Sequence, residues 1–130
     1  MNNDKCKVMY ETWEMQCCGT PFAIGDAIEW LVEYSPDGLR KPKEIQDIDY
    51  VYQAHNDVWQ KLMVLTGNVT DIVVDYEKFI EGTPVDEQLK RTDYADGHDE
   101  EIDGFSATAY IVTINDGKIR KAKKEEVTFE

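Results

Sequence analysis

The sequence predicts a mainly β protein with one helix, closed into a small β-barrel, and three observations lead to this class. Apolar and polar residues alternate over residues 5–15 and again over residues 27–34, which is the period of a half-buried strand. Residues 69–76 and 105–115 are rich in the β-branched and aromatic side chains that suit a pleated sheet. Glycine, proline, asparagine and aspartate punctuate the intervals between these segments as turns.

The whole chain is expected to form one domain. Its 130 residues are 42% hydrophobic, which is enough for one compact core, so residues 1–130 are predicted as a single unit.

The amino-terminal part is expected to hold two strands around a tight turn. Residues 5–15 form the first strand, and Gly19-Thr20-Pro21 breaks it because proline has no amide hydrogen to donate. After a turn at Gly25-Asp26, residues 27–34 form the second strand. The sequence Ser35-Pro36-Asp37-Gly38 ends that strand with a strong turn signal.

The one helix is expected between residues 45 and 65, where apolar side chains recur at three- and four-residue steps. The stripe consists of Ile45, Ile48, Tyr52, His55, Trp59 and Leu62. An alternative remains open, because Asn56-Asp57 favours a turn and would leave a short helix followed by a strand from Val58. Gly67 ends the helix in either case.

A polar middle follows the strand at residues 69–76. Residues 77–104 are expected as a long surface loop, and within them residues 92–104 form an acidic surface loop with six acidic groups and no lysine or arginine.

The carboxyl-terminal part is expected to supply the central strand. Residues 105–115 are apolar on both faces, which suits a strand with neighbours on both sides. Asn115-Asp116-Gly117-Lys118 predicts a hairpin turn, since Asp-Gly suits positive φ angles. A short pair, residues 118–122 and 127–129, then closes the domain.

The succession of glycine-led strands resembles that of SH3-like small barrels, with the OB-like barrel as the near alternative. The segments that carry this resemblance are Gly25-Asp26 before a strand, Gly67-Asn68-Val69-Thr70-Asp71-Ile72, Tyr110-Ile111-Val112, the Asp-Gly hairpin, and Val127-Thr128-Phe129.

A sharper pattern lies near the amino end: Trp13-x-Met15-x-Cys17-Cys18-Gly19-x-Pro21-Phe22-x-x-Gly25-Asp26. It resembles an uncharacterised family of small bacterial proteins with the same Cys-Cys-Gly-x-Pro-Phe signature. The resemblance covers about the first 35 residues closely and residues 67–75 loosely. It implies kinship and no particular activity.

The net charge of −13 excludes several classes of function. Nucleic-acid binders need lysine and arginine to displace condensed counterions, and anionic membrane surfaces are disfavoured for the same reason. With no export signal, no apolar run of about 18 residues and only three cysteines, the cytoplasm is the expected location. Charge is uneven, since residues 118–130 hold five basic and three acidic groups.

Thiol or metal chemistry would centre on Cys17 and Cys18. Neighbours on a regular strand point to opposite faces, so one is expected to pack as a small hydrophobe and the other to be the candidate nucleophile. A zinc ion would draw on these two with Cys6 and His55, although no Cys-x-x-Cys or His-x-x-x-His spacing is present.

The acidic loop contains a partial copy of a calcium-binding loop. Asp99, Glu101 and Asp103 are spaced alternately and Gly104 is sixth, but Tyr110 stands where the bidentate glutamate belongs. A full EF-hand is therefore excluded, and the three acids remain candidates for weak binding of a divalent cation. No other cofactor is expected.

No hydrolase, P-loop or dinucleotide signature is present, so a non-enzymatic binding module is the leading hypothesis. Its acidic surface would meet a basic protein or peptide, with Tyr50, Tyr52 and Tyr94 as candidate residues of a binding groove. The alternatives are a thiol- or metal-dependent activity at Cys17-Cys18, and an acidic inhibitor or immunity-type protein for a basic partner. The oligomeric state is not predicted.

Overall fold

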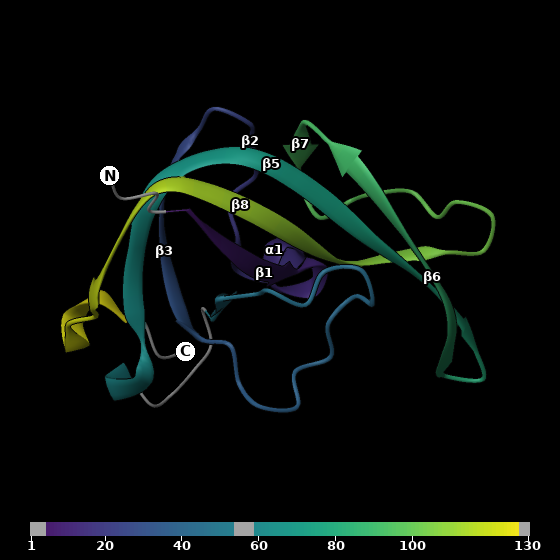
Figure 1. The fold of residues 1–130 in the computed structure, drawn as a ribbon, viewed down its shortest axis with the longest axis horizontal. Coiled ribbons are helices and arrows are strands. Elements are labelled where there is room, and N and C mark those ends of the chain that lie inside the picture. The colour runs from purple at the N-terminus through teal and green to yellow at the C-terminus, as the bar shows by residue number, and fades with distance from the viewer. Residues whose placement is uncertain (1–4, 54–58, 128–130) are drawn as a thin grey trace.

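The computed structural model describes residues 5–53 and 59–127, and strands dominate this part of the chain (Figure 1). In chain order the elements are β1 (Cys6–Glu11), α1 (Thr12–Cys18), β2 (Phe22–Ala23), β3 (Ala27–Tyr34), β4 (Tyr50–Tyr52), the 3-10 helix η1 (Trp59–Lys61), β5 (Met63–Ile80), β6 (Thr83–Thr92), β7 (Tyr94–Ala95), β8 (Ser106–Lys121) and the 3-10 helix η2 (Lys124–Glu126). The predicted class, mainly β with one helix, is confirmed.

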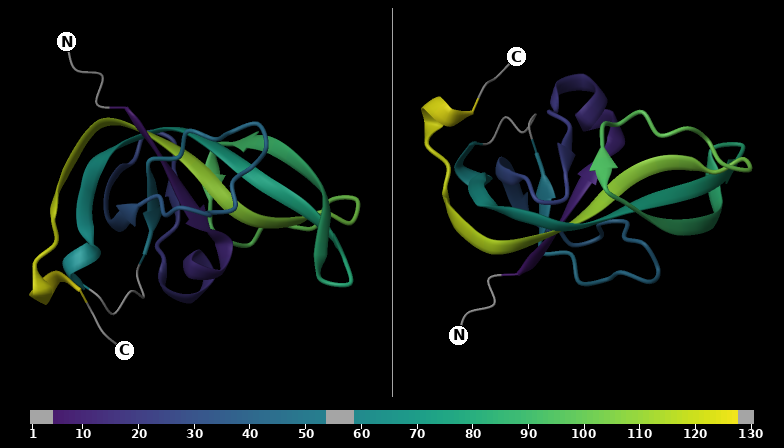
Figure 2. Two further views of the ribbon diagram at one scale, coloured as in Figure 1. Left: turned by 60° about the horizontal axis from the view of Figure 1, so that its bottom comes forward. Right: turned by 90° about the horizontal axis from the view of Figure 1, so that it is seen from above.

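Six strands form one ring-like sheet (Figures 1 and 2). Their order is β3-β4-β1-β8-β5-β6, and β3 also pairs with β5, so the first five strands return on themselves. β1 and β4 are parallel, whereas the other pairings in this sheet are antiparallel. β6 lies outside the ring along the second half of β5. β2 and β7 pair with each other in a separate small sheet.

The two longest strands bend because their ladder is interrupted. β5 has 18 residues and β8 has 16, and their pairing shifts register at three places, between Thr66 and Asn68, between Val69 and Asp71, and between Asp75 and Tyr76. Bulges of this kind bend a strand and increase its twist. Figure 1 shows both strands as long arches above β1, β3 and α1.

Gly67 occupies the first of these register shifts. A β-carbon at this position would meet Ile114 Cγ2 and would lie 2.8 Å from the carbonyl oxygen of Asn115. The expectation that Gly67 stops a helix is therefore wrong: the glycine lets two strands approach closely.

The interior of the ring is filled by aromatic rings. Tyr10 stacks on Tyr52 with ring centroids 3.9 Å apart, and Trp30 meets Tyr10 edge-on at 5.3 Å. Phe22 lies 5.0 Å from Trp30. These rings come from β1, β2, β3 and β4, so the amino-terminal segments build one end of the interior core.

The outer face of the sheet is covered by residues 35–49, here called the strap. Its ends are tied together because the amide of Ser35 donates to the carbonyl oxygen of Asp49 at 3.0 Å. Leu39, Ile45 and Ile48 of the strap pack on sheet residues. The residues beneath are Met9, Val51, Val73, Leu89, Ala109 and Ile111. The sheet therefore has an apolar layer on both faces, and the strap replaces a covering helix.

The segment after β1 differs from the prediction, because the chain turns into α1 instead of continuing as a strand. Thr12 Oγ1 donates to the carbonyl oxygens of Ala107 and Thr108 at 3.1 Å, which fixes the start of the helix on β8. Met15 is buried, whereas Trp13 is half exposed. The alternation over residues 5–15 is too short to distinguish a strand from a strand followed by one helical turn.

The predicted helix between residues 45 and 65 is absent from the described part of that range. Residues 45–49 belong to the strap, and β4, η1 and the start of β5 follow. Residues 54–58, with His55 and the predicted break at Asn56-Asp57, lie outside the described residues.

The second half of the chain contains more strand than predicted. Residues 77–91 are not a loop, since β5 continues to Ile80 and β6 returns through Glu81 and Gly82, which both have positive φ. The hairpin predicted at residues 115–118 is also wrong, because β8 runs through it and Asp116, with φ of 55°, lies within the strand. Of the last predicted strand pair, residues 118–121 are strand as the end of β8, and η2 occupies the stretch expected as the turn between the two members. Residues 128 and 129 of the second member lie outside the described residues.

Several predictions of elements are confirmed. β3 covers residues 27–34 and is followed by a turn at residues 37–38. Residues 69–76 lie within β5, and the predicted central strand is β8, which has β1 on one side and β5 on the other.

Replacing Gly67 with alanine is expected to lower the free energy of unfolding by about 1–3 kcal/mol, because the new methyl group must push on Ile114 and the backbone of β8. Denaturant titration measures the change, and Asn68→Ala, at an exposed neighbouring position, is the control. Equal stability of the two variants would contradict the close approach.

Candidate functional site

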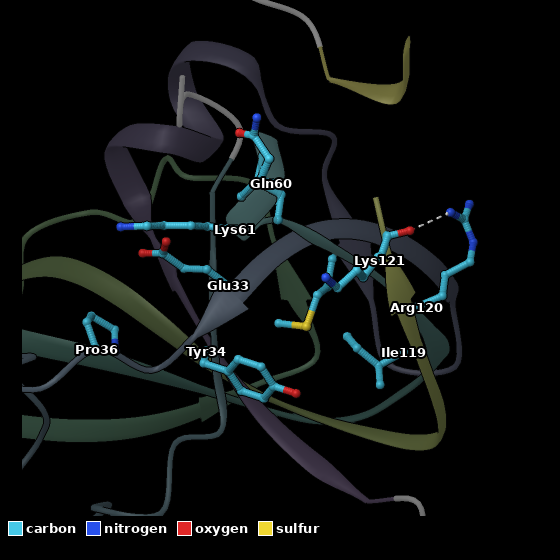
Figure 3. A pocket seen from close by; sticks show the side chains of 10 residues that line it. Glu33, Tyr34, Pro36, Gln60, Lys61, Ile119, Arg120 and Lys121 are labelled. Atoms are coloured by element: carbon cyan, nitrogen blue, oxygen red, sulfur yellow. Dashed lines mark hydrogen bonds between the residues drawn. The ribbon is translucent and has the colours of Figure 1, made fainter. Parts of the chain in front are cut away.

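A cleft of about 660 Å³ lies at one end of the ring-like sheet, between the end of β3, η1, the start of β5 and the end of β8 (Figure 3). This volume is within the range of pockets that hold small molecules. The lining residues are Glu33, Tyr34, Pro36, Gln60, Lys61, Leu62, Met63, Ile119, Arg120 and Lys121.

Strand register shows that this cleft is the open end of the interior. Met63 belongs to the interior core and lies opposite both Val32 and Lys121, so the three side chains share a face. Ile119, two residues before Lys121, points the same way, and so does Tyr34, two residues after Val32. The interior that aromatic rings fill at one end therefore continues into the cleft at the other.

The floor and walls of the cleft are largely apolar. Leu62 and Met63 are nearly buried, whereas Tyr34 is 67% exposed and Ile119 is 39% exposed. The ring of Tyr34 also leans on Tyr50, with centroids 5.6 Å apart. Two large apolar side chains on the interior face thus stand open to solvent.

The charge around the cleft differs in sign from that of the chain. Three cations, Lys61, Arg120 and Lys121, line it together with one carboxylate, Glu33. Arg120 is held by Glu126 through two hydrogen bonds of 2.8 and 2.6 Å. Within residues 5–53 and 59–127, Lys61 and Lys121 form no ion pair. Figure 3 shows Lys61 and Arg120 on opposite sides of the cleft.

A second cluster of polar groups lies where the strap crosses β5 and β6. Asp75 and Glu77 point to the same face of β5, and only 2% and 4% of their surfaces are exposed. Glu77 forms an ion pair with Arg40 of the strap and accepts a hydrogen bond of 2.8 Å from Thr108 Oγ1. Glu87 lies opposite Glu77 on β6 and accepts a hydrogen bond from a backbone amide of the strap. Carboxylates therefore fasten the strap to the sheet.

Asp75 is the member of this cluster without a cation of its own. Burial, followed by the neighbouring carboxylates of Glu87 and Glu77, raises the pKa of Asp75 to about 8, against the opposing effect of Arg40. Asp75 therefore carries a proton at neutral pH. The sequence gives one signal for this cluster, two acidic residues at alternate positions of a strand, and sequence reasoning missed it.

The cysteines are not arranged as the strand prediction implied. Cys17 and Cys18 end α1, and at this carbonyl end the helix does not stabilise a thiolate. Cys17 is exposed and is not a free thiol, and the side chain of Cys18 lies outside the described part. Burial, with a contribution from Asp49, raises the pKa of Cys6 to about 11, so this thiol is protonated at neutral pH.

The acidic loop is tied to the core. The hydroxyl of Tyr110 donates to Asp99 Oδ2 and accepts a hydrogen bond of 2.8 Å from the amide of Gly97. Glu101 Oε2 instead accepts a hydrogen bond from Ser106, and Asp103 is exposed with a positive φ. Among the described residues, no three histidine, cysteine or acidic side chains are placed to hold a metal ion. Weak binding of zinc or calcium stays a prediction.

The three tyrosines proposed for a groove occupy different surroundings. Tyr52 stacks in the interior core, and Tyr50 is half buried beside Tyr34 near the cleft. Tyr94 is exposed on β7, which belongs to the separate small sheet. Only Tyr50 thus approaches the cleft through a described ring contact.

Raising the pH from 6 to 8 is expected to lower the melting temperature through Asp75. Its unfolded carboxyl loses its proton near pH 4, whereas the folded one keeps it to about pH 8, so folding takes up a proton in this window. Stability therefore falls as pH rises and levels off above pH 8. Thermal unfolding of Asp75→Asn should lose this slope, and Asp71→Asn on the same strand should keep it. A wild-type melting temperature that is flat from pH 6 to 8 would contradict the buried proton.

Comparison with known proteins places the chain in a family. Residues 4–116 match the model of a family of unknown function (DUF6578). No curated protein and no solved structure matches the chain. None of the helices in the described part is both long enough and apolar enough to cross a membrane. Since the match covers most of the sequence, the chain belongs to this family of unknown function.

Proposed function

We propose that this chain is a non-enzymatic binding module and that the cleft at the open end of the ring-like sheet is its ligand site. The observation that carries the proposal is the continuity of the cleft with the interior core, because Tyr34 and Ile119 extend the interior face into solvent. Apolar pockets with a few polar groups around them are the usual form of small-molecule sites, and barrel mouths are a common place for them.

Two further expectations belong to the same proposal. The return of five strands on themselves supports a small barrel of the SH3-like kind, with the OB-like barrel as the alternative. A cytoplasmic location is supported by the scarcity of cysteine. Thiol-dependent activity receives no support from Cys6, whose thiol is protonated at neutral pH.

N-phenyl-1-naphthylamine, a neutral aromatic probe that fluoresces in apolar surroundings, is expected to bind the native protein. Ile119→Ser and Tyr34→Ala should each weaken binding about threefold to tenfold, because each removes apolar contact area from the cleft. Tyr94→Ala, which removes another exposed tyrosine ring elsewhere, is the matched control. Equal weakening by the control, or no binding, would refute the proposed site.

A second candidate function is favoured by the anchoring of the acidic loop. The hydroxyl of Tyr110 donates a hydrogen bond to Asp99 and accepts one from the amide of Gly97. These bonds hold the acidic loop against the core, so its carboxylates form a preorganised surface for a basic protein or peptide. An inhibitor or immunity-type protein would use the same surface on a basic enzyme.

An octalysine peptide is expected to bind this surface in low salt, and Glu100→Gln and Asp103→Asn should weaken it because both side chains are exposed on the loop. Isothermal titration calorimetry measures the affinity. Asp37→Asn removes the same charge from an exposed position in the strap and should have a smaller effect. If Asp37→Asn weakens binding as much as the loop variants do, the peptide responds to net charge alone and the loop is not a specific surface.

A further inference from the structure

We propose that the ligand of the cleft is a small organic anion, whose aromatic or aliphatic body lies against the interior face and whose anionic group meets Lys61 and Lys121. This inference rests on the proposed function, since it assigns the chemistry of the ligand to that same site.

The first argument is the local reversal of charge. The chain has a net charge of −13, yet the lining of the cleft holds three cations and one carboxylate, a local balance of 3 − 1 = +2. Glu126 compensates Arg120, and Glu33 accepts a hydrogen bond from Gln53 Nε2 at 3.2 Å. The carboxylate of Glu33 keeps its charge, so with Glu126 counted the local balance is 3 − 2 = +1. Among the described residues, the two cations of the cleft that form no ion pair are Lys61 and Lys121.

The second argument is the position of Lys121 on its strand. It lies opposite Met63 and shares a face with Ile119, so its cation stands at the edge of an apolar surface. A wall of low dielectric strengthens the field of a charge beside it, which favours an anion over water at this point. Lys118, three residues earlier, points to the opposite face of the same strand.

The third argument concerns the kind of anion. Lysine offers a compact charge with three rotatable donors and does not impose the planar, two-pronged geometry of arginine. Arg120, the arginine of the cleft, already forms a bidentate pair of hydrogen bonds with Glu126. The site thus selects for one negative charge attached to an apolar body, and a carboxylate, a sulfonate or a phosphate monoester would each satisfy it.

Two fluorescent probes with one shared body separate the parts of the proposal. 8-Anilinonaphthalene-1-sulfonate carries a sulfonate, and N-phenyl-1-naphthylamine has the same aromatic body without it. The sulfonate probe is expected to bind about tenfold more tightly to the native chain, and added salt should reduce only this advantage. Lys121→Gln and Lys61→Gln should each weaken the sulfonate probe about fivefold and leave the neutral probe unchanged.

The controls separate recognition of the anion in the cleft from the effects of net charge and of misfolding. Lys118→Gln removes the same charge from the opposite face of β8 and should leave both probes unchanged, whereas Lys121→Arg should retain the preference for the sulfonate. Melting temperatures, together with binding of the neutral probe, report whether each variant is folded.

Each outcome decides a different point. Tighter binding of the sulfonate that depends on Lys121 and Lys61 supports the inference. Two outcomes would refute an anionic ligand and leave the proposed binding site in place. One is binding of the neutral probe without any preference for the sulfonate, and the other is equal effects of Lys121→Gln and Lys118→Gln. Failure of both probes to bind overturns the inference and the proposed function together.

Discussion

The backbone ladder between β5 and β8 is the interaction on which the rest of the structure depends. β1 attaches to the free side of β8, whereas β3 and β6 attach one after the other to the free side of β5. Without this ladder the other strands of the ring-like sheet have no paired strands to attach to. Its last pair, Met63 opposite Lys121, also lies in the cleft, so the element that holds the fold together builds the candidate site.

The large excess of acidic residues is distributed in two ways. Most carboxylates lie on the surface, but Asp75 and Glu77 are buried where the strap meets the sheet. A buried charge must be neutralised or paired, so Asp75 is protonated and Glu77 forms an ion pair with an arginine. The lining of the cleft, with three cations and one carboxylate, is a local exception to this acidic surface. A basic carboxyl-terminal segment in an acidic chain is visible in the sequence, but only the fold places Lys121 beside the apolar interior.

Clear local patterns could be predicted from the sequence. The boundaries of β3 follow from alternation between two turn signals, and the central place of β8 follows from its apolar character on both faces. Residues 77–80 at the end of β5 were missed because Glu77 and Lys78 look like loop residues. Glu77 pairs with β6 and β8 and Lys78 pairs with β6, and this pairing overrides their low strand propensity.

Other patterns have two physical meanings, and the sequence does not choose between them. Asp116-Gly117 suits a hairpin turn, but a positive φ equally serves an irregularity within a long strand. Ile45, Ile48 and Tyr52 have helical spacing, yet the first two pack on the outer face of the sheet and the third in the interior. The cleft had no signal of its own, because it arises from strand register.

The pairing of β1 with β8 joins segments about a hundred residues apart, with Val8 opposite Val112. During synthesis the ribosome delivers β1, β3 and β4 long before their common frame exists. β1 can pair with β4, and β4 with β3, but these strands lack their contact with β8 until it emerges. Nascent chains with exposed apolar segments aggregate or recruit chaperones. The acidic residues spread along the early part of the chain repel one another, which opposes association of such segments. The charge of this protein thus serves the growing polypeptide as well as the finished one.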